Sequence, residues 1–298
     1  MFADCINLLK APELPATTLA NSCYTGMFSG CKNLINAPKL PATLLVKECY
    51  GSMFKGCTSL TTAPELPATI LAEECYYNMF QGCTNLNSAS KLPAITLAGR
   101  CYESMYSDCI NLTSAPELPA TTLAKDCYYG MFYNCTRLST APELPATTLV
   151  ESCYSMMFNN CTSLTTAPKL PATTLAESCY KSMFTCCTNL TTAPELPATN
   201  LAIRCYKEMF SSCINLIATP KLNATTLVDE CYKAMFNSCS KLNQITMLAT
   251  DISASQCLGL WVGAVSTTGT FIKSASMDDL PSGSSGIPSG WTVVDYTE

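Results

Sequence analysis

The chain has 298 residues, of which 48% are hydrophobic and only 13% are charged. Its 17 basic and 22 acidic side chains give a net charge of −5, and the basic residues form no stripe, which argues against a nucleic-acid partner. No apolar run reaches the roughly 18 residues of a membrane helix, so we predict no transmembrane segment. The sequence has no histidine, the commonest general base and metal ligand. We therefore predict that the protein is not an enzyme and has no catalytic residue, cofactor or metal site.

Cysteine reveals an internal repeat. Two series of ten cysteines each recur at intervals of 26 residues. The first comprises Cys5, Cys31, Cys57, Cys83, Cys109, Cys135, Cys161, Cys187, Cys213 and Cys239. The second comprises Cys23, Cys49, Cys75, Cys101, Cys127, Cys153, Cys179, Cys205, Cys231 and Cys257. Equal intervals stack equivalent side chains in columns, so the spacing predicts a solenoid of about ten coils.

The first half of each coil is predicted to be a strand. In the unit that begins at Cys57, a short half-apolar stretch runs from Leu60 to Leu66 and is rich in threonine. Pro64 cannot donate a hydrogen bond to a sheet, so it must lie at the strand's end or at a bulge. Stacked strands would form a parallel sheet on one face of the solenoid.

The second half of each coil is predicted to be a short helix that starts at Pro67, since proline suits a first helical turn. One helical face would carry Leu71, Cys75, Tyr76, Met79 and Phe80. A second short strand centred on Ile70 and Leu71 is the alternative. In either case the interior should contain Leu60, Leu66, Leu71, Cys75, Met79, Phe80, Cys83 and their equivalents. The predicted fold class is therefore α/β.

The recurring segment at Met53–Pro67 reads MFKGCTSLTTAPELP. It resembles the BspA-like leucine-rich repeats, whose members carry AFxGCxSLTSI at the same place in each coil. The resemblance extends over residues 1 to about 242 and implies a right-handed, curved solenoid. It also implies a surface or secreted protein of gut or oral bacteria that is linked to adhesion.

The ends of the chain differ from its middle. Met1 to Cys5 align on Met27 to Cys31, so the chain starts inside a repeat, and we expect it to be a fragment of a longer protein. We predict a solenoid over residues 1–242, and a degenerate last coil with a small β-rich cap over residues 243–298. Strands are expected at residues 270–274 and 291–296. Asp278 and Asp279 are expected to be solvated loop carboxylates.

The repeating cysteines and a repeating set of charged residues are both expected to be structural. The cysteines fall on apolar positions, where a free thiol behaves as a small buried hydrophobe. Disulfides between coils and a zinc site remain as alternatives, and Cys186, which is out of phase, is expected to be exposed.

The residue before the last leucine of each strand forms a second column, which we call the charge column. It contains Glu13, Lys39, Glu65, Lys91, Glu117, Glu143, Lys169, Glu195 and Lys221. We predict that these side chains form ion pairs between neighbouring coils.

The candidate partner-binding surface lies on the predicted sheet, where side chains vary while interior residues stay constant. It comprises Lys10, Asn36, Thr62, Ser88, Ser114 and Thr140, with the off-pattern tyrosines Tyr77, Tyr129 and Tyr133, which we expect to be exposed. The tyrosines next to the second cysteine series are expected to be partly buried. The favoured function is a cell-surface or secreted, non-catalytic binding or adhesion scaffold for a host or microbial protein or a glycan. A structural spacer or phage-tail-like module without a small-molecule ligand is the alternative. We expect a monomer.

Overall fold

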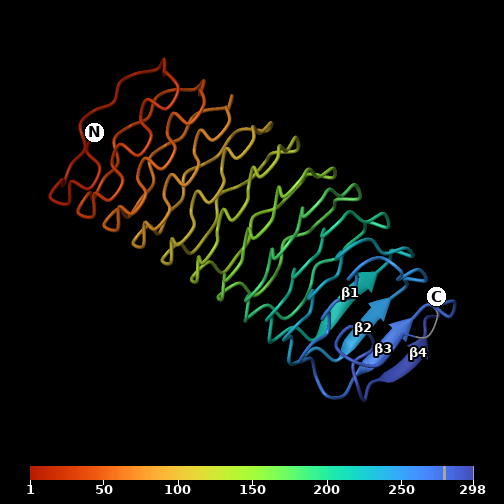
Figure 1. Cartoon of the computed structure of the whole chain (residues 1–298). Coiled ribbons are helices and arrows are strands. Elements are labelled where there is room, and N and C mark those ends of the chain that lie inside the picture. The colour runs from red at the N-terminus through yellow and green to blue at the C-terminus, as the bar shows by residue number, and fades with distance from the viewer. Residues whose placement is uncertain (278–279, 298) are drawn as a thin grey trace.

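The chain forms a rod of stacked coils whose termini lie at opposite ends (Figure 1). The computed structural model describes residues 1–277 and 280–297, so Asp278 and Asp279 lie outside the described residues. Parallel bridges join equivalent residues of neighbouring coils, such as Thr62 to Ser88 and Thr166 to Thr192. The repeat of the sequence is thus the repeat of the structure, and the solenoid prediction is confirmed.

A continuous parallel sheet forms at the C-terminal end (Figure 1). Its strands, in order, are β1 (Ala218–Leu222), β2 (Gln244–Met247), β3 (Thr270–Lys273) and β4 (Thr292–Asp295). The strands predicted at residues 270–274 and 291–296 are confirmed in β3 and β4. This sheet joins the last coils of the regular repeat to the C-terminal region, and the domain boundary at residue 242 stays a prediction.

Elsewhere the strands shrink to single-residue bridges, and proline is the reason. Neighbouring coils pair at Thr62 and Ser88, and the Ala63 N–H donates to the Ser88 carbonyl, but no backbone hydrogen bond joins residues 64–67 to the next coil, because Pro64 and Pro67 lack a donor. The sequence supplies an internal comparison, because β2 and β3 contain no proline and pair without interruption. Where β1 contains Pro220, its register with β2 shifts.

The predicted helices are absent from the described residues, and that prediction is wrong. The segment from residue 72 to residue 83, with its equivalents in other coils, is a ribbon of four-residue turns, which we call the turn ribbon. Alternate N–H groups bond within the coil and to the next coil. The Met79 N–H donates to the Tyr76 carbonyl at 3.1 Å, and the Phe80 N–H donates to the Met105 carbonyl of the next coil at 2.9 Å.

A left-handed residue takes the third position of the turns that end at Cys75, Met79 and Cys83. Glu74, Asn78 and Gly82 have φ values of 57°, 53° and 73°. These residues reverse the chain before a helical i−4 bond forms, and they free every second N–H for the neighbouring coil. The alternative strand near Ile70 is nearer the truth than the helix, because Ile70 bridges to Leu44.

The core lies between the turn ribbon and the opposite wall, and aromatic columns fill it. Phe54 and Phe80 stack with ring centroids 5.6 Å apart, and Tyr50 and Tyr76 stack at 5.9 Å. The tyrosine column is more buried than predicted, since Tyr76 is only 1% exposed. The phenylalanine column ends at Trp261, which meets Phe236 edge-on at 62°.

In the coil that begins at Cys57, the predicted interior is confirmed at every position except Leu71, which is half-buried. The cysteines occupy this interior as thiols, and only Cys5, Cys23 and Cys186 are not fully buried. The first series donates to the coil before it, as in the 3.1 Å bond from Cys57 Sγ to the Phe28 carbonyl. Burial raises the pKa of Cys57 to about 12, which keeps the thiol protonated.

Candidate binding surface

The wall opposite the turn ribbon consists of residues 61–70 and their equivalents, and we call it the proline wall. The polar residues predicted to bind a partner form one exposed column along it. The members are Lys10, Asn36, Thr62, Ser88, Ser114 and Thr140. Bridges join them in pairs, such as Lys10 with Asn36 and Ser114 with Thr140. The structure therefore brings these six residues into one line.

A second polar column, which the sequence analysis missed, runs along the other edge of the proline wall. Thr121, Thr122, Thr147 and Thr148 are exposed, and Thr148 bridges to Thr174 in the next coil. The signal was present in the recurring PATT segment. Because two adjacent residues of a strand normally face opposite sides, nothing in the sequence predicted that both would face solvent.

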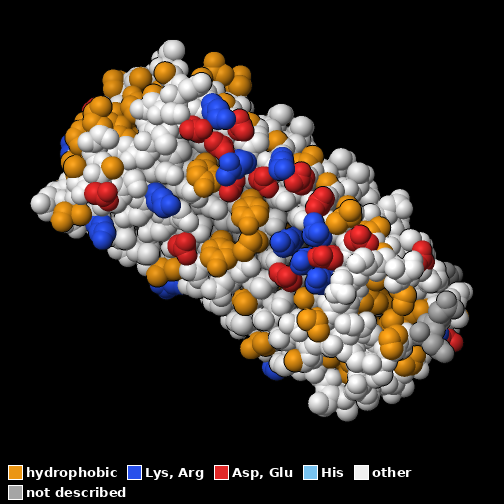
Figure 2. All heavy atoms as spheres, viewed as in Figure 1, with side chains coloured by type: hydrophobic (Ala, Val, Ile, Leu, Met, Phe, Trp, Pro, Cys, Tyr) orange, Lys and Arg blue, Asp and Glu red, His pale blue; other side chains and the backbone are white. Residues whose placement is uncertain are grey.

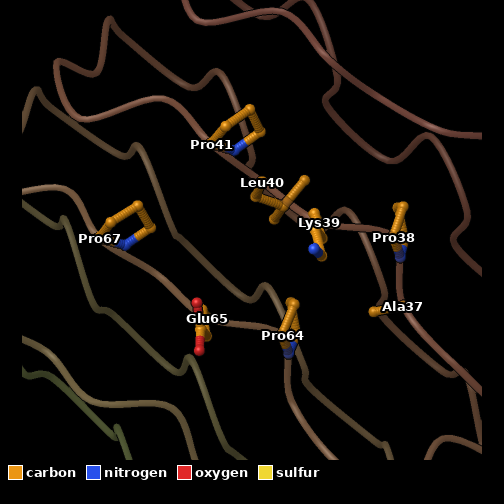
Figure 3. A pocket seen from close by; sticks show the side chains of 8 residues that line it. All are labelled: Ala37, Pro38, Lys39, Leu40, Pro41, Pro64, Glu65 and Pro67. Atoms are coloured by element: carbon orange, nitrogen blue, oxygen red, sulfur yellow. The ribbon is translucent and has the colours of Figure 1, made fainter.

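Hollows separate neighbouring coils on the proline wall. One has a volume of about 440 Å³, and Figure 3 shows Lys39 and Glu65 on its two sides, with the rings of Pro41 and Pro67 beyond them. Equivalent hollows lie between Glu65 and Lys91 and between Lys169 and Glu195. They occur where proline prevents the coils from hydrogen bonding.

The predicted ion pairs of the charge column do not form. Across residues 1–277 and 280–297, no member of the column has an oppositely charged group within 4.0 Å. Ion pairs between coils occur instead on the turn ribbon, where backbone hydrogen bonds hold the coils together. Lys47 pairs with Glu73 at 2.9 Å.

Two networks on the turn ribbon join three or more charges. Arg100 contacts Glu74 of the preceding coil and Glu103 of its own. Lys207 donates to Glu230 at 2.6 Å, which lowers the pKa of that carboxyl. Figure 2 shows acidic and basic side chains beside one another along one face of the rod. On this face the mixture leaves no patch of a single sign.

The three off-pattern tyrosines lie on the turn ribbon. Tyr133 is exposed, whereas Tyr77 and Tyr129 are only half-exposed, so their prediction as exposed residues was wrong. The Arg100 guanidinium lies 5.1 Å from the centre of the Tyr77 ring. The Tyr129 hydroxyl donates to Met156 Sδ at 3.0 Å. Both rings are thus already engaged within the chain.

The structure separates these tyrosines from the polar column. The ring of Tyr106 starts on the turn ribbon and crosses the core, where its hydroxyl accepts the Ser90 N–H of the proline wall at 3.1 Å. The two walls are therefore opposite sides of one core, and their outward-facing residues point apart. A single partner on the proline wall would not reach the tyrosines.

Within residues 1–277 and 280–297, no three Cys, Asp or Glu side chains are grouped as metal ligands. Cys186 is half-buried with φ of 61°, in the place that Gly82 occupies in an earlier coil. The described part of the chain has no helix that could serve as a membrane span.

Stacked coils with parallel bridges, leucine columns and a polar outer column define a leucine-rich repeat protein. The chain belongs to the family described as BspA type leucine rich repeat region, whose model matches residues 1–138 and 74–217. The resemblance in sequence is thereby confirmed. A comparison with curated proteins gives no match.

Among solved structures, a leucine-rich repeat protein from Bacteroides ovatus is similar at 15% identity. The match covers 98% of this chain and 85% of that one, with a TM-score of 0.32.

Proposed function

We propose that the protein is a non-catalytic binding scaffold whose proline wall recognises an extended protein or glycan. The exposed column from Lys10 to Thr140 carries this proposal, because it offers one polar side chain per coil along the rod. Solenoids use such elongated surfaces to bind extended partners. Leucine-rich repeat families are scaffolds of this kind.

The hollows add a second element of recognition. At about 440, 490 and 360 Å³, all three fall within the range of small-ligand sites, roughly 300–1,000 Å³. Their walls are proline rings, and Lys39, Glu65 and Lys91 supply charge. A sugar ring or a peptide side chain would fit between coils while the polar columns hold the rest of the partner.

We place the protein at the cell surface or outside the cell, on the strength of the BspA-like repeats. Host or microbial proteins and glycans are the partners that this location offers. Buried free thiols fit that location only if they escape oxidation, and the complete burial of Cys57 and its equivalents from Cys31 to Cys239 supports this.

A glycan array combined with pull-downs on host matrix proteins tests the proposal. A variant with Thr62→Arg, Ser88→Arg and Ser114→Arg should lose binding, because three bulky charges would cover the polar column. The matched control is Ile203→Arg, an exposed site on the opposite wall. If the intact protein binds nothing above background, the proposal fails and a structural spacer becomes the better account. If the triple variant binds like the control, the partner site lies elsewhere.

A further inference from the structure

The charge column forms no ion pairs within the described part of the chain, yet its charges follow a regular order along the rod. Eight of its nine side chains are exposed, and the ninth, Lys221, rests on the Tyr296 ring at 4.9 Å. The signs alternate along the rod except at one step, from Glu117 to Glu143. Regular stacking keeps the nine groups in one line, since Lys39 and Glu65, and likewise Lys169 and Glu195, line the same hollows.

The single break in alternation makes the column complementary to its own reverse. Reading it from both ends toward Glu117 places opposite charges together at every step. The pairs are Lys39 with Glu195, Glu65 with Lys169 and Lys91 with Glu143. The outermost pair is Glu13 with Lys221, and only Glu117 meets itself. An uninterrupted alternation over nine positions would give like charges throughout.

We propose that the proline wall binds a second copy of this chain, antiparallel and face to face, with the two-fold axis at Glu117. The sequence alone led us to expect a monomer, and this inference goes beyond the proposed function. Because the dimer covers the same wall, the partner proposed above would bind the monomer and compete with dimerisation. A two-fold interface is self-complementary, so each pair occurs twice. A parallel two-fold arrangement allows no offset and would place every charge against its own kind. In the antiparallel arrangement, sliding one chain by one coil in either direction brings mostly like charges together.

The rest of the wall suits such an interface. Exposed prolines, including Pro41, Pro67 and Pro145, flank the charges, and proline loses no side-chain freedom on burial. Eight steps of about 4.8 Å and a width of about six extended residues of about 3.3 Å each give a face of roughly 800 Å². That is the area that each partner contributes to a standard protein interface, about 800 Å².

Sedimentation of the full chain over a range of protein and salt concentrations tests the proposal. We expect a monomer–dimer equilibrium that salt shifts toward monomer. Lys39→Glu and Glu195→Lys should each raise the dissociation constant by about tenfold or more, because symmetry turns two attractions into repulsions. Glu117→Gln should tighten the dimer by removing the one like-charge contact. An unmodified chain that stays monomeric at every concentration would overturn the proposal.

The double variant Lys39→Glu with Glu195→Lys is decisive, because it restores both opposing pairs across the two chains. Within one chain the double variant places like charges side by side, since the new acidic residue 39 lies between Glu13 and Glu65, and the new basic residue 195 lies between Lys169 and Lys221. We expect dimerisation to recover to within a few-fold of the unmodified chain. If the double variant associates no better than the single ones, the charges act only within the chain and the proposal is wrong.

Two further measurements complete the test. Lys47→Glu reverses a charge on the turn ribbon, where Glu73 is its partner, and should leave the dimer unchanged. Small-angle scattering should give a dimer of the same maximum length as the monomer, because the two rods overlap completely. A particle of twice the monomer's length would mean end-to-end association and would contradict the antiparallel arrangement.

Discussion

Ser90 and Tyr106 replace the residues that occupy their positions in neighbouring coils. Where Ser90 lies, the coils before and after have Pro64 and Pro116, and where Tyr106 lies, the coil before has Phe80. The exchange of proline for serine introduces an N–H into the core, and the Tyr106 hydroxyl accepts it at 3.1 Å. Ser90 is only 6% exposed, so water cannot replace this acceptor. We expect the two substitutions to be energetically coupled.

Tyr106→Phe should destabilise the protein by about 1–3 kcal/mol, the cost of a buried donor without an acceptor. Ser90→Pro should also be destabilising, because it leaves the Tyr106 hydroxyl without its donor and removes the 2.5 Å bond from Ser90 Oγ to the Pro64 carbonyl. The double variant recreates the pattern of the other coils. Its stability should be close to that of the unmodified chain, helped by about 0.4–1 kcal/mol from the rigidity that proline gives the unfolded chain.

Urea denaturation of the four proteins measures this cycle, with far-ultraviolet dichroism and tyrosine fluorescence as separate probes, since a solenoid need not unfold in one step. The coupling energy should be about 1–3 kcal/mol in favour of the matched pairs. Thermal midpoints should differ by on the order of 2 °C per kcal/mol for a chain of this size. Additive effects of the two single substitutions would refute the reasoning.

Three further predictions follow from the core and the turn ribbon. In native protein, Ellman's reagent should react quickly only with Cys5, Cys23 and Cys186, and with the other thiols only after unfolding; rapid reaction of all 21 cysteines would contradict the burial of the two columns. Stability should fall in alkali, because burial raises the pKa of Cys49 to about 11. A thiol whose pKa rises on folding contributes its full stability below the unfolded value of about 8.5, and that contribution is lost as the pH rises from there toward 11. A urea midpoint that is equal at pH 7 and pH 10 would exclude this linkage, with the two pH values chosen as about 1.5 units on either side of the unfolded pKa. Finally, Asn134→Val should cost about 2 kcal/mol or more, since Asn134 has φ of 58° and bonds to Asp108 at 2.8 Å and to Asn160 at 2.7 Å. Asn134→Gly relieves the backbone strain but not the lost bonds, so its midpoint should lie between those of Asn134→Val and the unmodified chain, and equal midpoints for both variants would leave no role for φ.

The interior could be predicted because it depends only on which residues recur. Cys57, Leu60 and Phe80 repeat at equal intervals, and stacking alone places them in columns. The helix could not be excluded, because Cys75, Tyr76, Met79 and Phe80 have the same spacing on a helix of 3.6 residues per turn as on turns of four. Over so short a segment the two periods hardly diverge.

The turn ribbon would have been recognisable only from its left-handed positions. Asn78 and Gly82 favour positive φ, but Glu74 and Met156 adopt it as well, so one coil gives a weak signal. The polar column of the candidate site followed from its place beside Leu60 and its equivalents. The absence of ion pairs in the charge column could not be predicted from the sequence, because ion pairing depends on how far proline holds neighbouring backbones apart.

Trp261 makes the C-terminal end of the aromatic column different from the rest of the column. Each phenylalanine of the core offers a flat face on which one more ring could lie, and the series would accept further units without limit. The Trp261 ring meets the rings of Phe236 and Phe271 at 62° and 86°, and its Nε1 donates to the Gly286 carbonyl at 2.8 Å. Parallel stacking therefore stops at Trp261, so the inner rings present no open face on this side to which another molecule could add.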